Sequence, residues 1–99
     1  MFASMIEIQI RSGKMIDAIK RFEDRKGEIE QLGCKQAMLI DKGNDQAIVL
    51  VIYDTEEAQK AATPLATKIL RSLALLYAKI PERVAVNLPI NWTYYSDYS

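Results

Sequence analysis

The sequence has no histidine and a single cysteine, Cys34. Without histidine there is no imidazole general base, no Ser-His-Asp triad and no histidine ligand for a metal ion. One thiol can form neither an internal disulfide nor a cysteine-rich zinc site, which fits a reducing compartment. We therefore expect a cytoplasmic protein with no metal and no cofactor.

Other absences narrow the class of protein. All apolar runs are shorter than the roughly 18 residues that a membrane span needs, and residues 1–5 lack the features of a signal peptide. Thirteen basic and thirteen acidic residues cancel, which argues against a nucleic-acid or membrane-surface partner. Four glycines, three prolines and a 49% hydrophobic content indicate a folded chain. The length predicts one domain, residues 1–99.

The hydrophobic periodicity of the first half changes from strand-like to helical and back. Alternation predicts a strand over residues 4–11, with isoleucines 6, 8 and 10 on one face. Helical spacing then predicts a helix that begins near Met15, is capped by Ser12 and continues to Leu32, with a kink at Gly27. A strand over residues 34–41 follows.

The second half repeats this order. The turn at 42–45 joins the strand 34–41 to another at 46–53, so the two predict an antiparallel hairpin. A helix capped by Asp54 or Thr55 comes next, breaks at Pro64, and resumes to Ile80. A last strand covers residues 83–88, and residues 90–99 form an aromatic tail.

The element order β-α-β-β-α-β predicts an α+β protein with a ferredoxin-like fold. Right-handed crossovers place both helices on one face of a four-stranded antiparallel sheet, in which the strands 4–11 and 46–53 are central. Residues 47–53 are apolar without interruption, although a strand with one wet face should alternate. The open face spans roughly 350 Å², and monomers seldom leave such a patch bare. We expect a homodimer through this face; the alternative is a valine-rich strand that stays wet.

Three segments accompany this order: Leu32-Gly33-Cys34, Lys42-Gly43-Asn44-Asp45, and Tyr53-Asp54-Thr55-Glu56-Glu57-Ala58. Over residues 4–90 the pattern resembles the dimeric α+β barrel superfamily, and within it the antibiotic biosynthesis monooxygenase-like branch. The resemblance implies a homodimer whose sheets form a barrel, and a cavity between sheet and helices in each subunit. Its enzymes include cofactor-independent oxygenases of polycyclic aromatics and haem-degrading oxygenases. The latter ligate iron through a histidine that this chain lacks, so we do not expect haem degradation.

Three polar side chains are pocket candidates on the strands. Glu7 and Gln9 lie opposite the isoleucines and would face the dimer space, either as a substrate-orienting or proton-handling pair or as a solvated rim. They are the nearest counterparts of an asparagine that the haem-degrading branch carries in its first strand, but neither is a true match. Asn87 would offer a polar contact or a cross-strand pair.

Three aromatic side chains complete the set of candidates. Tyr53 stands where active members of the family often carry tryptophan, and it would line a pocket, as would Tyr77. The structural alternative places both rings in the core with their hydroxyl groups paired. Trp92 belongs to the tail, which we expect to lie as an arm across the partner subunit or as a lid over a pocket mouth.

These residues support two functions. We expect a small homodimeric α+β barrel protein of undetermined activity, which holds a small apolar or aromatic metabolite or serves as an assembly module, without chemistry. The alternative is a cofactor-independent monooxygenase-like enzyme acting on an aromatic or enolic substrate through the two tyrosines, with Glu7 as the only plausible base. A closed cavity of about 300 Å³ or more beside Tyr53 and Glu7 would favour the enzyme, and a filled core there would end that hypothesis.

Overall fold

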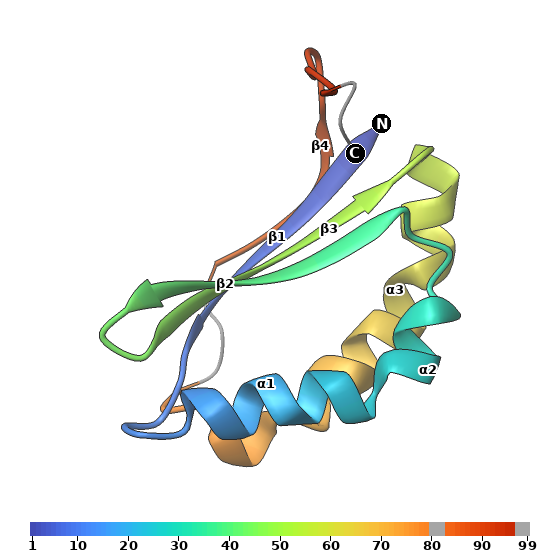
Figure 1. Cartoon of the computed structure of the whole chain (residues 1–99). Helices are drawn as coiled ribbons and strands as arrows, with labels where there is room; N and C mark the ends of the chain where they lie inside the picture. Colours follow the sequence, from blue (N-terminus) through green and yellow to red (C-terminus); the bar gives the residue numbers. More distant parts are fainter. Residues whose placement is uncertain (80–82, 97–99) are drawn as a thin grey trace.

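The computed structural model describes residues 1–79 and 83–96, with Arg83 described by its backbone alone. The elements follow the predicted order, with the first helix in two pieces and a short 3-10 turn, η1, after the last (Figure 1). Their bounds are β1 Phe2–Gln9, α1 Met15–Asp24, α2 Lys26–Glu30, β2 Gln36–Gly43, β3 Gln46–Tyr53, α3 Glu56–Arg71, η1 Ala74–Leu76 and β4 Arg83–Pro89. The α+β ferredoxin-like fold is confirmed.

The four strands form one antiparallel sheet in the order β2-β3-β1-β4, so β1 and β3 are central as predicted. The helices all lie on one face of this sheet (Figure 1). The core fills the space between the two layers. It consists of isoleucines 6, 8 and 10 of β1, Val49, Val51 and Tyr53 of β3, Ala62 and Ile69 of α3, Ala18 of α1, and Leu32, Leu73 and Tyr77.

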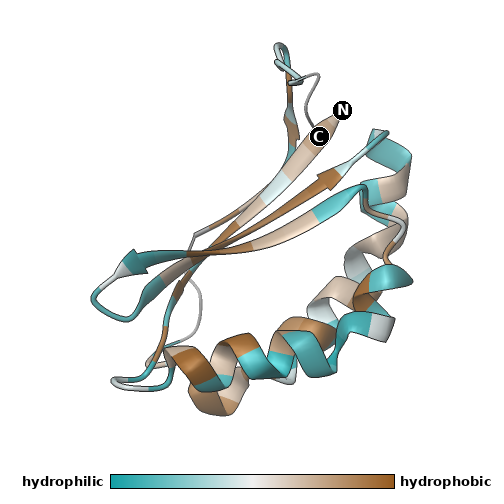
Figure 2. Cartoon of the chain, viewed as in Figure 1, coloured by the Kyte–Doolittle hydropathy of each residue, from teal (hydrophilic) through white to brown (hydrophobic). Residues whose placement is uncertain are grey.

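The opposite face of the sheet has no helix over it (Figure 1). Leu50 of β3 pairs with Met5 of β1 and with Met38 of β2, and side chains directly opposite each other share a face. Ile48 and Ile52 lie on the same face by alternation. Along β3 this gives apolar side chains on both sides of the strand, which Figure 2 shows as a nearly continuous hydrophobic ribbon.

Two local predictions hold because short-range chemistry decides them. Asn44 and Asp45 both have positive φ angles, 55° and 61°, which is the conformation of a two-residue hairpin turn between twisted strands. The Thr55 hydroxyl group accepts a hydrogen bond from the amide of Ala58 at 3.1 Å and thereby caps α3. Asp54, the alternative cap, is not used.

The first helix differs from its prediction at two points. Ser12 does not cap it: α1 begins after Lys14, and no side chain caps its amides. The break falls at Arg25 and not at Gly27, which lies within α2. The Arg25 amide reaches both the Arg21 and the Phe22 carbonyl oxygens at 3.1 Å, so the last turn of α1 tightens. The Arg25 guanidinium then pairs with Glu28 at 2.7 Å and fixes the start of α2.

The prediction for the last helix is wrong in two respects. Pro64 does not break α3, which runs unbroken through it. Pro64 has no amide hydrogen to donate to the Lys60 carbonyl, and the helix continues because the turn before it is held by other contacts. The Thr63 hydroxyl group donates to the Gln59 carbonyl at 3.2 Å, and Ala62 is buried. The helix also ends at Arg71, far before Ile80, which lies outside the described residues. There the Ser72 hydroxyl group donates to the Ile69 carbonyl at 2.6 Å.

Candidate functional site

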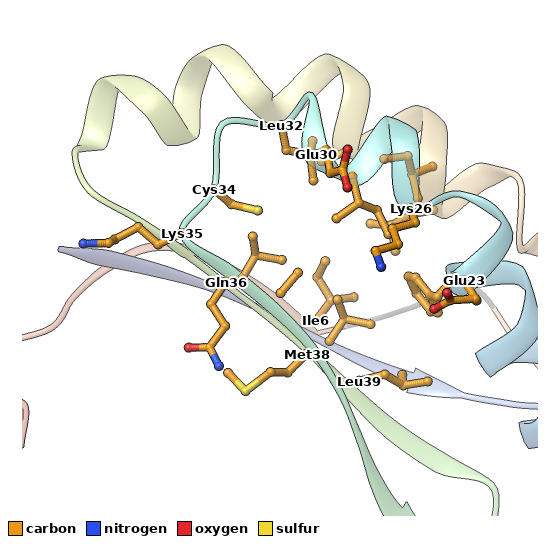
Figure 3. A pocket seen from close by; sticks show the side chains of 18 of the residues that line it. Ile6, Glu23, Lys26, Glu30, Leu32, Cys34, Lys35, Gln36, Met38 and Leu39 are labelled. Atoms are coloured by element: carbon orange, nitrogen blue, oxygen red, sulfur yellow. The ribbon is translucent and has the colours of Figure 1, made fainter. Parts of the chain in front are cut away.

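A cavity of about 470 Å³ lies between the sheet and the helices, as the family resemblance implies (Figure 3). Its walls are mostly apolar and come from every layer of the fold. The sheet contributes Ile6, Ala37, Met38, Leu39, Val49 and Val51; α1 and α2 contribute Ile19, Phe22 and Ile29; α3 contributes Ala66, Ile69 and Leu70; Leu32 completes the wall.

Charged side chains stand only at the edge of this cavity. Glu23, Lys26, Glu30 and Lys35 all contribute to its lining, and all four are exposed. The cavity therefore opens to solvent where α2 and the segment before β2 separate. Its interior offers apolar contact, and its mouth offers two carboxylate groups and two ammonium groups.

Cys34 contributes a thiol to the wall of the cavity. It lies in the loop between α2 and β2, is half-buried, and directs its sulfur towards the cavity (Figure 3). Burial raises the pKa of the Cys34 thiol, although a hydrogen bond to its own backbone opposes the shift. The thiol is therefore protonated at neutral pH, and a protonated thiol is a poor nucleophile.

Tyr53 and Tyr77 lie in the core and not in the lining of the cavity. Tyr53 is 2% exposed, and burial raises its pKa, followed by the influence of Cys34. The Tyr77 hydroxyl group donates to the Leu70 carbonyl at 2.9 Å, and burial raises its pKa to about 12. Both rings lie in the core, and the paired hydroxyl group of the structural interpretation is seen for Tyr77.

Glu7 and Gln9 lie on the other face of the sheet from the two tyrosines. The Lys42 ammonium approaches Glu7 to 3.9 Å, and Gln9 donates to the Asp45 carbonyl at 3.3 Å. One chain therefore does not assemble the catalytic set that the enzymatic hypothesis combines. The cavity is large enough for that hypothesis, but neither Glu7 nor Tyr53 contributes to it.

Asn87 and Trp92 also lie outside the cavity. The pairing of β1 with β4 shifts between Ala3 and Met5, and Asn87 adopts a positive φ of 54° at this irregularity, which interrupts the alternation expected for β4. Its side-chain oxygen is buried and has no hydrogen-bond partner among the described residues. Trp92 is 81% exposed, so within one chain its ring neither packs against the core nor covers the mouth.

The sequence pattern did not identify the residues at the mouth, because the helical region is rich in charges of both signs. Glu23 and Lys26 belong to a stretch that the sequence pattern assigns to a solvated surface, and both are indeed exposed. Phe22 and Ile29 follow helical spacing and could have identified the inward side of this region. Periodicity carries no signal for a space that those side chains leave unfilled.

The described residues form neither a metal site nor a membrane-spanning helix. Within residues 1–79 and 83–96, no three histidine, cysteine or acidic side chains gather in a way that could hold a metal ion. Over the same residues, no helix combines the length and apolar character of a membrane span.

Comparisons with known proteins identify the architecture. No family model and no curated protein matches the sequence. A candidate antibiotic biosynthesis monooxygenase from Chloroflexus aurantiacus superposes with a TM-score of 0.68 at 13% identity, covering 94% of this chain and 96% of its own. A second such protein, from Nitrosomonas europaea, gives 0.70 at 9% identity, covering 91% and 99%. A dimeric ferredoxin-like protein from an uncultured marine organism gives 0.68 at 14% identity, covering 96% and 92%.

The chain shares the α+β ferredoxin-like fold of these structures. The resemblance inferred from the element order and the three short segments is confirmed at the level of the fold. TM-scores of 0.68–0.70 establish this fold, and identities of 9–14% leave the activity to be argued from the site.

Proposed function

We propose that this α+β barrel protein binds a small apolar or aromatic metabolite in the cavity between its sheet and its helices. The observation that carries the proposal is the cavity itself, about 470 Å³ with apolar walls and an open mouth. Ligand sites in proteins have this size and this character. The thiol of Cys34 is the only side-chain hydrogen-bonding group directed into the described wall below the mouth, so apolar contact dominates recognition.

We also propose that the protein is a cytoplasmic homodimer joined through the open face of the sheet. Leu50 stands at the centre of this face between Met5 and Met38, flanked by Ile48 and Ile52. A central strand with apolar side chains on both sides is suited to burial on both sides. A similar structure is described as a dimeric ferredoxin-like protein, and the single half-buried cysteine fits a reducing compartment.

Cys34 provides a reporter for occupancy of the cavity, because it is the only cysteine in the sequence and its sulfur faces the space. The rate of alkylation by iodoacetamide, at mildly alkaline pH, is measured with and without 1-octanol or 2-naphthol. Ala66→Phe places a ring in the cavity, and Ala61→Phe places the same ring on the exposed side of α3.

We expect both compounds to slow alkylation of the natural protein and of Ala61→Phe, and to have no effect on Ala66→Phe. Thermal melts of both variants show whether each is folded. Unchanged alkylation of the natural protein contradicts the proposal. Equal slowing in all three proteins also contradicts it, because binding would then lie outside the cavity.

The second candidate is a cofactor-independent oxygenase acting on an aromatic or enolic substrate. It rests on the two similar structures described as candidate monooxygenases and on a cavity that suits an aromatic ring. Tyr53, Tyr77 and Glu7 do not meet in the cavity, so this activity needs a base from the substrate or from the mouth. Oxygen uptake with 2-naphthol that disappears in Ala66→Phe would favour this candidate over simple binding.

A further inference from the structure

Lys26 is the charged residue of the mouth whose ammonium group extends over the cavity. Figure 3 shows it directed from α2 towards the sheet, whereas the ammonium group of Lys35 points away from the cavity. The remaining wall beneath it is apolar. The position of this ammonium group therefore suits a ligand atom at the mouth better than one at the bottom of the cavity.

The acidic neighbours of Lys26 do not neutralise it by direct pairing. Glu30 follows it by four residues, a spacing at which lysine and glutamate often pair on a helix. Lys60 pairs with Glu56 at this spacing at 3.0 Å. Lys26, in contrast, forms no ion pair within 4 Å to any residue in the described part of the chain. Its ammonium group is left available to an anion.

The balance of charges decides what kind of recognition this allows. Glu23 and Glu30 offset Lys26 and Lys35, so the mouth has no net charge to attract an anion from a distance. Selectivity must arise at short range, where a bound anion touches the Lys26 ammonium group above an apolar wall. A charged hydrogen bond partly removed from water is stronger than one at an open surface.

We infer that the ligand of the cavity is an apolar molecule ending in a carboxylate or another anionic group, which Lys26 binds at the mouth. The inference rests on the proposed function and names the class of ligand for the same site. A neutral molecule of the same size gains only the apolar contacts. An ammonium-ended molecule meets the Lys26 charge and is disfavoured.

The test compares three probes with the same eight-carbon chain: octanoate, 1-octanol and octylammonium. Affinity is measured as protection of Cys34 from alkylation, and each rate is divided by the ligand-free rate of the same variant, so that altered thiol reactivity cancels. Lys26→Gln removes the charge over the cavity. Lys35→Gln is the matched control, because it removes a charge at the same mouth that points away.

We expect the natural protein to bind octanoate about tenfold more tightly than 1-octanol, and octylammonium most weakly. Lys26→Gln should abolish the preference for octanoate and leave 1-octanol binding unchanged, and Lys35→Gln should keep the preference. Equal binding of octanoate and 1-octanol by the natural protein overturns this inference alone. An equal loss of the preference for octanoate in Lys26→Gln and Lys35→Gln also overturns it alone. Binding of neither compound overturns the proposed function and this inference together.

Discussion

Replacing Tyr77 by phenylalanine should make the stability of the protein depend on pH in a different way. Tyr77 is buried, and its hydroxyl group donates to the Leu70 carbonyl at 2.9 Å. Phenylalanine keeps the ring and loses this bond, while the Leu70 carbonyl still accepts a hydrogen bond from the Leu73 amide at 3.1 Å. We expect Tyr77→Phe to lower the free energy of unfolding by about 1 kcal/mol at neutral pH.

The raised pKa of Tyr77 determines what happens in alkali. A tyrosine in the unfolded chain ionises near pH 10, and Tyr77 in the folded chain near pH 12. Below pH 10 both states hold the proton, so the stabilising contribution is complete. Between these values the unfolded state loses its proton first, and the folded state is progressively disfavoured. The shift corresponds to a loss of up to about 2.5 kcal/mol by pH 12.

Combining the two effects predicts a crossover. The natural protein is more stable at neutral pH, and Tyr77→Phe becomes the more stable protein in the upper part of the window from pH 10 to 12. Urea unfolding followed by circular dichroism, at one fixed protein concentration, measures the difference at each pH. Only the difference between the two proteins is used, so that the effect of alkali on every group they share cancels.

Leu75→Ala supplies the control, because this side chain is 79% exposed on the helical side and cannot ionise. The difference in stability between Leu75→Ala and the natural protein should stay constant at every pH. A difference between the natural protein and Tyr77→Phe that stays constant from neutral pH to pH 12 would refute the reasoning. It would mean that the Tyr77 hydroxyl group ionises as freely in the folded chain as in the unfolded one.

Two further predictions concern the proposed dimer. Light scattering at micromolar concentration should give about twice the 11.2 kDa mass of the chain, and a monomeric natural protein would contradict the dimer. Leu50→Lys should reduce the measured mass to that of one chain. Leu75→Lys, at an exposed position on the helical side, should leave the mass unchanged. Deleting residues 91–99, which include the exposed Trp92, should lower the melting temperature of the dimer, because we propose that the tail contacts the partner; an unchanged melting temperature excludes that contact.

Features that depend on neighbours in the sequence could be predicted. Strand β3 was predicted with its observed limits, Gln46–Tyr53, because its uninterrupted apolar run and the flanking turn are both signals within a few residues. The hairpin turn at Asn44 and Asp45 and the cap at Thr55 are local for the same reason. The order of these elements, with right-handed crossovers, was enough to predict the sheet and the face that its helices cover.

Features that depend on packing could not be predicted from the sequence. Pro64 reads as a helix breaker, and only the contacts of the surrounding turns keep α3 continuous through it. The sequence pattern places Tyr77 in a helical apolar stripe. In the structure Tyr77 lies beyond the end of α3 and forms an isolated antiparallel β-bridge with Ile10, and both residues belong to the core.

The cavity belongs to the same class of feature. The sequence by itself determined which side chains are apolar, in which order the elements come, and that one sheet face is left open. The tertiary structure alone decided that α1 and α2 stand far enough from the sheet to leave an unfilled space, and that Lys26 reaches over it. The physical reason is that a volume between layers depends on how all of them pack at once, and no short stretch of sequence records that sum.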